Sequence, residues 1–335
     1  MLLEKAMLSA NAGSDATSED PGDLGNSATV DRKTYDRVVR KFGTAMLQPA
    51  SRVRTHAFFT ALSNLQADEI PALMRLFRRL NQQGLSYPEE WNALWVRAGE
   101  INGGKAVEYL LGNSNAQWAE GSIKNAFQGW ASTDAKGPID WLTTHEDSPF
   151  YEQAFIGYIT GYSERDLDAS TKMVKESMPA THPLASKAME TLAEAAVRHG
   201  QLRGMQEWFD SLPNEGGQQS FKFSAFMHVW WRTYHANPEM AQQFLADTAA
   251  QPWRDDRMYD VMTRKLAESE PSNALKWAAT LSPSPKDGRW PGVAQAAQAW
   301  MRKDPVTANA WINEQPESPF LDYLNGTIGR GRQPQ

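Results

Sequence analysis

The chain has 335 residues, of which 41% are hydrophobic and 22% charged, a composition typical of a soluble globular protein. It contains no cysteine, which excludes disulfides, thiolate zinc sites, iron–sulfur clusters and a cysteine nucleophile. The net charge is −6, and no apolar run reaches the roughly 18–20 residues of a membrane-spanning helix. This length exceeds one compact domain of typical size and favours either two domains or an elongated repeat array.

Residues 1–29 are predicted to form a flexible acidic leader. They are rich in Ser, Gly, Asn and Asp, and few large apolar residues follow Leu8. The segment lacks both the basic and the apolar region of an intact signal peptide. We therefore expect a soluble protein and favour the cytoplasm, whereas removal of a signal before Met1 would place the protein outside it.

Residues 30–45 are predicted to form an amphipathic basic helix that Asp31 caps. The wider stretch 31–80 holds ten Lys and Arg residues against four acidic residues, a net +6 inside an acidic chain. Its cations recur at helical spacing in two stripes, which together form the candidate binding patch: Lys33, Arg37, Arg40, Lys41, Arg75, Arg78 and Arg79. We expect these side chains to be largely exposed.

Three interpretations of this basic patch remain open. The first is structural: the cations form a solvated face or a dock for the acidic leader. The second is a surface for an anionic protein partner, and the third is contact with nucleic acid. The sequence pI near 5.6 argues against nucleic acid.

Residues 46–328 are predicted to form a helical-repeat array, and 329–335 a loose tail. A spacing rule recurs in the array at intervals of about 34 residues. Each copy begins with an anchor that resembles a helix N-cap, often followed by Pro, with a small residue at +4 and an aromatic at +7. The clearest anchors are Asn102, Asp134, Asn237, Glu270 and Asp304, and weaker copies begin at Asp68, Asp166 and Gln201.

Each position of this rule has a physical reason. Asp or Asn caps the free N–H groups of a helix start, and Pro loses nothing at the next position. A small residue at +4 lets a neighbouring helix approach, and the aromatic at +7 fills the space beside it. We therefore expect helices to begin within about two residues of the anchors. We also expect Trp141, Trp277 and Trp311 to be mostly buried.

Between one anchor and the next, the pattern indicates helix, loop, helix and tight turn. One such hairpin cannot bury both faces alone, so the prediction is an all-α fold, an α-solenoid of about eight stacked helical hairpins. The period resembles that of the tetratricopeptide and related bacterial helical-repeat families over about residues 51–328. The Leu-Gly pair of the tetratricopeptide pattern is absent, and the repeat here is W-x3-D/N-P-x2-A-x2-W. The resemblance implies protein or peptide binding and carries over no functional residue.

The motifs of catalysis are missing from the sequence. No pair of its histidines has the spacing of a zinc-binding helix, and no Walker, dinucleotide or nucleophile-elbow motif occurs. The loop cluster His145, Glu146 and Asp147 is more typical of a surface than of a metal site. We expect neither a catalytic residue nor a cofactor or metal.

The adjacent pair Trp230 and Trp231 departs from the repeat. Because neighbouring residues on a helix point in different directions, one of them must leave the main buried face and become a candidate groove aromatic. The favoured function is a non-enzymatic scaffold that binds a protein or peptide, an acidic one where the basic patch is concerned. The alternative is a nucleic-acid-binding repeat protein that uses the basic N-terminal units, and no membrane span is expected.

Overall fold

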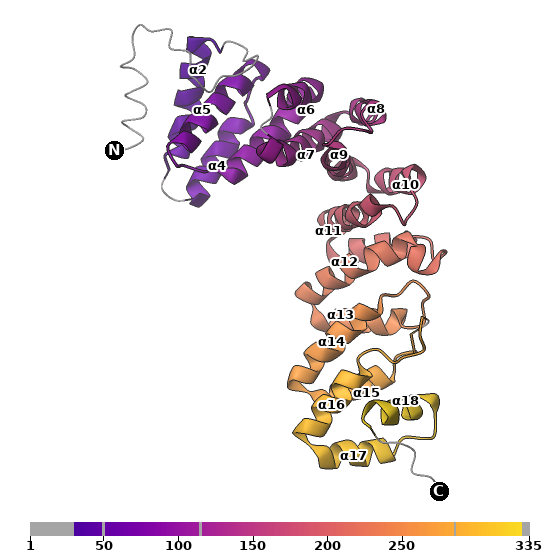
Figure 1. Cartoon of the computed structure of the whole chain (residues 1–335). Coiled ribbons are helices and arrows are strands. Elements are labelled where there is room, and N and C mark those ends of the chain that lie inside the picture. Colours follow the sequence, from indigo (N-terminus) through magenta and orange to yellow (C-terminus); the bar gives the residue numbers. More distant parts are fainter. Residues whose placement is uncertain (1–29, 49–50, 114–115, 285, 330–335) are drawn as a thin grey trace. The chain divides into compact units, whose positions relative to one another are not determined.

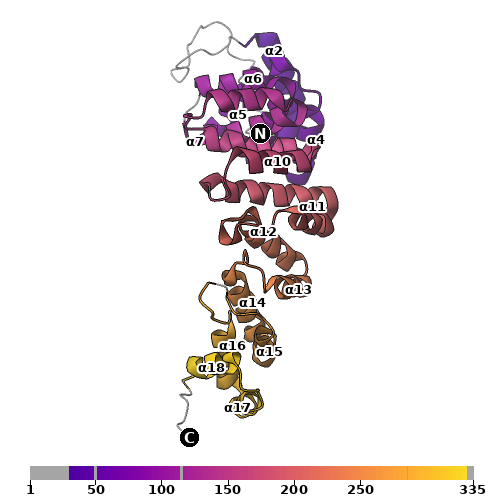
Figure 2. The ribbon, with the colours of Figure 1, turned by 90° about the vertical axis from the view of Figure 1, so that its right-hand side faces the viewer.

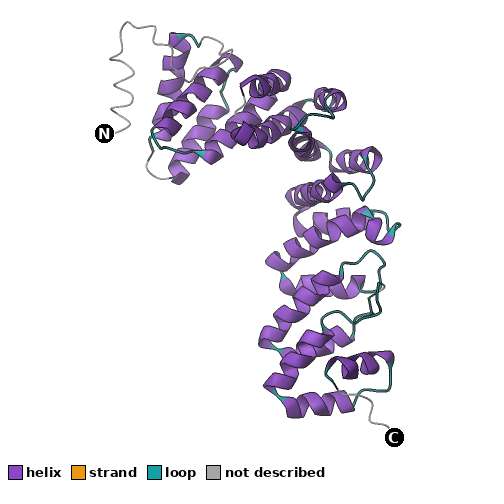
Figure 3. Cartoon of the chain, viewed as in Figure 1, coloured by secondary structure: helices purple, strands orange, loops and turns teal. Residues whose placement is uncertain are grey.

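The computed structural model describes residues 30–48, 51–113, 116–284 and 286–329, so the predicted leader and nearly all of the predicted tail lie outside the described residues. Within these ranges every regular element is a helix and none is a strand (Figure 3). The all-α prediction is thus confirmed. In the same ranges, no helix has the length and apolar character needed to cross a membrane. The contacts divide the chain into two compact units, Met1–Ser170 and Thr171–Gln335.

Unit 1 holds helices of very unequal length (Figure 1). They are α2 (Arg32–Val38), α3 (Thr44–Met46), α4 (Ser51–Leu62), α5 (Ile70–Gln82), α6 (Pro88–Asn113), α7 (Ala116–Thr133), α8 (Lys136–Thr144) and α9 (Tyr151–Arg165). A π-helical turn, Val39–Gly43, joins α2 to α3, so the predicted basic helix has a wider turn in its middle. The predicted cap is confirmed, because Asp31 Oδ2 accepts a hydrogen bond from the Thr34 N–H at 3.1 Å.

Unit 2 continues from α10 (Leu167–Ser177), which crosses the boundary between the units. Its helices are α11 (Pro183–Ser211), α12 (Phe221–Ala236), α13 (Pro238–Thr248), α14 (Asp256–Ser269), α15 (Pro271–Ala279), α16 (Val293–Lys303), α17 (Pro305–Asn313) and α18 (Pro319–Thr327). From α11 to α17 each helix packs against the next along the chain, and both views show this order (Figures 1 and 2). In addition, α16 contacts both α14 and α18.

A single residue forms the corner between two helices at three of the clearest anchors, Asn237, Glu270 and Asp304, whereas Asp134 and Ala135 together separate α7 from α8. The Asn237 N–H completes α12 by donating to the Thr233 carbonyl at 2.7 Å, and the Asn237 side chain starts α13 by accepting from the Met240 N–H at 3.1 Å. Asp304 does the same between α16 and α17. The extended backbone at these two corners is nearly identical, with φ −155° and −151°. The predicted helix starts are confirmed at Asn102, Asp134, Asn237, Glu270 and Asp304.

The buried stripe behind each corner differs from the predicted one. The small residue at +4 is buried, as in Ala241 and Ala308, but its partner in the core is the residue at +8, as in Leu245 and Ile312. The other buried pairs at +4 and +8 are Ala72 and Leu76, Ala106 and Leu110, Pro138 and Leu142, Ser170 and Val174, Met205 and Phe209, and Ala274 and Ala278. Steps of four residues stay on one helix face, so +8 lies on the buried side and +7 at its edge.

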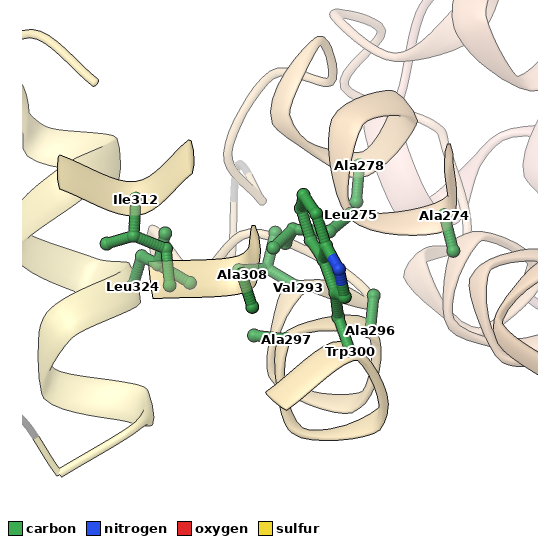
Figure 4. Packing of buried hydrophobic residues seen from close by; sticks show 10 residues of the cluster. All are labelled: Ala274, Leu275, Ala278, Val293, Ala296, Ala297, Trp300, Ala308, Ile312 and Leu324. Atoms are coloured by element: carbon green, nitrogen blue, oxygen red, sulfur yellow. The ribbon is translucent and has the colours of Figure 1, made fainter. Parts of the chain in front are cut away.

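The aromatic at +7 is accordingly less completely buried than the residue at +8 in most copies, with buried Trp208 as the exception. The prediction that Trp141, Trp277 and Trp311 are mostly buried is confirmed, although each ring lies at the edge of its helix face and keeps some exposure. Trp311 packs against the core: its ring lies 5.7 Å from that of Trp300, which is buried in a cluster formed by α15, α16, α17 and α18 (Figure 4). Trp300 Nε1 donates to Thr307 Oγ1 at 3.2 Å. The repeated phrase therefore serves packing and helix capping.

Candidate functional site

The basic patch of the sequence is partly a structural ion-pair network. Glu69, whose side chain is only 4% exposed, accepts a hydrogen bond from Lys41 Nζ and forms an ion pair with Arg37 Nε, each at 3.0 Å. Arg37 also contacts Asp68 at 2.9 Å. The same Glu69 carboxylate caps the backbone N–H of Gln66 at the start of the turn before α5. Arg37 and Lys41 thus tie α2 and the following π-helical turn to the beginning of α5.

The remaining cations of the patch divide into two groups. Lys33, Arg40 and Arg75 are exposed, and the Arg75 guanidinium lies 5.4 Å from the centre of the Tyr35 ring. Arg78 and Arg79 are half-buried, so the prediction that the patch is largely exposed is wrong for these two cations and for Lys41, whose side chain is 25% exposed. Arg78 and Arg79 follow Leu76 and Phe77 and precede Leu80, all buried, and therefore flank the core-facing side of α5. Only the first group offers open positive charge on this surface.

The adjacent tryptophans of α12 have opposite environments, as the sequence predicts. Trp230 is fully buried, whereas Trp231 exposes 47% of its surface. Two neighbouring rings hold Trp231 in place: Tyr234 stacks at 5.9 Å, and His235 meets it edge-on at 4.7 Å. An exposed indole held by its neighbours loses little conformational freedom when a ligand contacts it.

A groove of about 580 Å³ runs beside Trp231, between residues 190–202 of α11 and residues 228–236 of α12. We call it the Trp231 groove. Its apolar lining comes from Ala193, Val197 and Leu202, and its charged lining from Glu190, Glu194 and Arg232. The volume lies within the range of small-ligand sites, roughly 300–1,000 Å³.

The charges of the groove are only partly compensated. Arg232 Nη2 of α12 pairs with Glu194 of α11. One turn earlier on both helices, His228 Nδ1 lies 3.8 Å from the Glu190 carboxylate, beyond hydrogen-bond distance. Burial lowers the pKa of His228 and outweighs the two neighbouring carboxylates, Glu190 and Glu194, which raise it. Its Nε2 is buried with no hydrogen-bond partner among the described residues, a poor environment for imidazolium.

The backbone at one edge of the Trp231 groove is irregular. The φ/ψ angles within α11 become non-helical at Gly200 and Gln201, and Gln201 has φ 57° and ψ −150°. Among the described non-glycine residues, Gln201 alone has a positive φ. Such a conformation costs of order 1–3 kcal/mol outside glycine and persists when the surrounding structure imposes it. The weak repeat copy at Gln201 is thus a distorted corner, and it borders the groove.

Sequence reasoning pointed to the pair Trp230 and Trp231 without distinguishing them, treated Gln201 only as a weak anchor, and missed Glu190 and Glu194. Glu190 and Glu194 lie one turn apart on α11, and His228 and Arg232 lie one turn apart on α12. Two acidic residues one turn apart on one helix, followed on the next helix by His and Arg one turn apart, are the sequence signal that could have located this charged groove. Pairing them requires the register between α11 and α12, which the spacing rule does not provide.

A second cavity, of about 620 Å³, lies in unit 1 between α4 and the start of α6. The exposed ring of Phe59 lines it, together with Arg54 and Glu90. Glu90 is buried and accepts from Arg54 Nε at 3.1 Å and from Thr55 Oγ1 at 3.4 Å. Because Arg54 and Glu90 pair with each other, they are less available to bind a ligand than the charged groups of the Trp231 groove.

No group of three or more His, Asp or Glu side chains in the described ranges is placed to hold a metal ion. Comparison of the chain with family models, with curated proteins and with solved structures gives no match. The functional argument therefore depends on the geometry of this chain alone.

Proposed function

We propose that the chain is a non-enzymatic binding scaffold, an α-solenoid of about eight helical hairpins with a period near 34 residues, which holds a peptide in the Trp231 groove. Support for the solenoid comes from the corners. The same one-residue junction recurs at Asn237 and Asp304, and the same +4 and +8 residues are buried behind each anchor. Recurrent junctions of this kind are typical of stacked helical repeats.

One observation carries the binding proposal: an indole 47% exposed in a groove beside charged side chains. Indole is among the groups that most often dominate recognition of protein segments. The aromatics at the regular corners, such as Trp300 and Trp311, pack against each other. Trp231 does not follow the spacing rule and contacts only its own helix neighbours among the rings of the described residues.

The nucleic-acid alternative has weaker support. Two of its proposed contacts, Arg37 and Lys41, already bind Asp68 and Glu69. Lys33, Arg40 and Arg75 could contact an acidic partner or phosphates, and binding of either kind would weaken steeply with salt. We therefore keep this surface as a secondary one and place peptide binding at the groove.

Selection of displayed random peptides on the full chain tests the proposal. Peptides enriched on the wild-type protein should bind the Trp231→Ala variant at least about tenfold more weakly, as expected for an anchoring aromatic. The matched control is Val306→Ala, which truncates an apolar side chain that is 77% exposed on α17 and should leave binding unchanged. Equal binding to wild type and Trp231→Ala would contradict the proposal.

A further inference from the structure

We infer that the Trp231 groove receives a cationic side chain, lysine or arginine, of the bound peptide. The inference rests on the proposed peptide-binding function and adds the chemistry of the residue that is recognised. Two features of the groove carry it: an indole that is 47% exposed and an excess of negative charge beside it.

The exposed indole provides the first feature. Ammonium and guanidinium groups are attracted to the face of tryptophan, the strongest of the aromatic side chains in this interaction. Tyr234 and His235 hold the Trp231 ring from the side of its own helix. Ala193 and Val197 of α11 form an apolar lining across the groove. The aliphatic stem of a lysine or arginine matches such a lining, and its charged end can remain near the rim.

The charge balance provides the second feature. The groove holds two carboxylates, Glu190 and Glu194, against one guanidinium, Arg232. Arg232 pairs with Glu194, which leaves Glu190 without a cation of its own in the groove. His228 lies 3.8 Å from Glu190, and because burial lowers its pKa, it is mainly neutral near pH 7.

The Glu190 side chain is also accessible, with 52% of its surface exposed. It can therefore pair with an incoming cation without a rearrangement of α11. An acidic side chain at the same place would be repelled by Glu190. Arg232 would offset little of this repulsion, because it already pairs with Glu194. The complementarity thus favours a cation over an anion.

Binding of defined peptide pools to the full chain tests this inference. The probes are four pools of capped, fluorescently labelled nonapeptides, randomised except for a central lysine, arginine, norleucine or glutamate. Norleucine has nearly the length of lysine without its charge. We expect the lysine and arginine pools to bind about tenfold more tightly than the norleucine pool, as measured by fluorescence anisotropy at pH 7.5.

Two variants locate the effect. Glu190→Gln should weaken the lysine pool about fivefold and leave the norleucine pool unchanged. The matched control is Glu207→Gln, which changes an exposed glutamate of α11 that lies outside the groove and pairs with Arg203. Thermal unfolding of both variants should follow that of the wild type, since both side chains are exposed.

The outcomes separate the two proposals. If the norleucine pool binds as tightly as the lysine pool, or if Glu207→Gln weakens binding as much as Glu190→Gln, the cationic inference is wrong while peptide binding stands. If no pool binds the wild-type chain more tightly than it binds Trp231→Ala, the proposed function is wrong as well.

Discussion

Asp304 and Gln201 each begin a copy of the spacing rule in the sequence, but the backbone differs at the two corners. At Asp304 the backbone is extended and the carboxylate caps the Thr307 N–H at 3.1 Å. At Gln201 the backbone has φ 57°, and Gly200 before it has also left the helical conformation. The first corner lies between tightly packed helices, whereas the second borders the Trp231 groove.

This contrast is consistent with the proposal of a repeat scaffold that has one peptide-binding site. Where the junction is regular, each of its residues has a structural role: the anchor caps, Ala308 lets the neighbouring helix approach, and Ile312 fills the core. Where the junction is distorted, α11 and α12 leave open space with an exposed indole beside it. The following predictions test this difference, beginning with the largest expected effect.

Truncation of a buried +8 residue should cost far more than truncation beside the groove. Leu245→Ala, behind the regular Asn237 corner, removes a fully buried side chain and should lower the free energy of unfolding by about 2–5 kcal/mol. Leu202→Ala, next to the Gln201 corner, removes a partly buried side chain and should cost about 1 kcal/mol. Urea unfolding monitored by circular dichroism measures both, and equal costs would contradict the contrast.

Replacing an anchor that caps a helix should lower the free energy of unfolding measurably. Replacing an anchor that makes no cap hydrogen bond should lower it much less. Asp304→Ala removes the acceptor for the Thr307 N–H and should destabilise the chain by about 1 kcal/mol. Glu270→Ala is the control, because the Glu270 side chain makes no cap hydrogen bond to the backbone of α15. It should cost less than about 0.5 kcal/mol. A control as costly as Asp304→Ala would show that capping does not explain the anchors.

Relief of the distorted corner should stabilise the protein. Gln201→Gly removes the penalty of a side chain at φ 57°, and the added flexibility of the unfolded chain offsets part of the gain, leaving about 1 kcal/mol of stabilisation. Asn237→Gly, at an extended corner, should instead lose a few tenths of a kcal/mol with its cap. Denaturant midpoints that fall for both variants would argue against strain at Gln201.

The buried imidazole of the groove should make stability sensitive to mild acid. Burial lowers the pKa of His228 below its ordinary 6.5, so below about pH 6.5 the unfolded chain binds this proton more readily than the folded chain. Stability should fall as the pH decreases from about 6.5 towards the folded-state pKa. His228→Gln should flatten this part of the profile, measured by urea midpoints between about pH 7 and pH 5. An unchanged slope in the variant would contradict the prediction.

The sequence allows prediction of the features that depend on local chemistry. Asp304, Pro305 and Ala308 each have a side chain that suits one position of a helix start, and the corners form where these residue types recur. The +8 position escaped notice because leucine, isoleucine, valine, phenylalanine and alanine all occupy it, so no residue type recurs there.

The features that depend on contact between helices could not be predicted in this way. Arg37 and Asp68 are separated by 31 residues, and their pairing depends on how α2 packs against the region before α5. The meeting of Glu194 with Arg232 depends in the same way on the register of α11 and α12. Spacing along one helix shows which side chains share a face and says nothing about what that face contacts.

Hydrogen–deuterium exchange of the full chain, with and without a saturating capped nonapeptide carrying a central lysine, tests most directly the claim that recognition takes place at the Trp231 groove. Because bound peptide restrains the helices that it contacts, exchange should slow in residues 190–202 and 228–236 of the wild-type chain and should be unchanged in Trp231→Ala. Protection confined to α2–α5, or protection that persists in Trp231→Ala, would contradict the account.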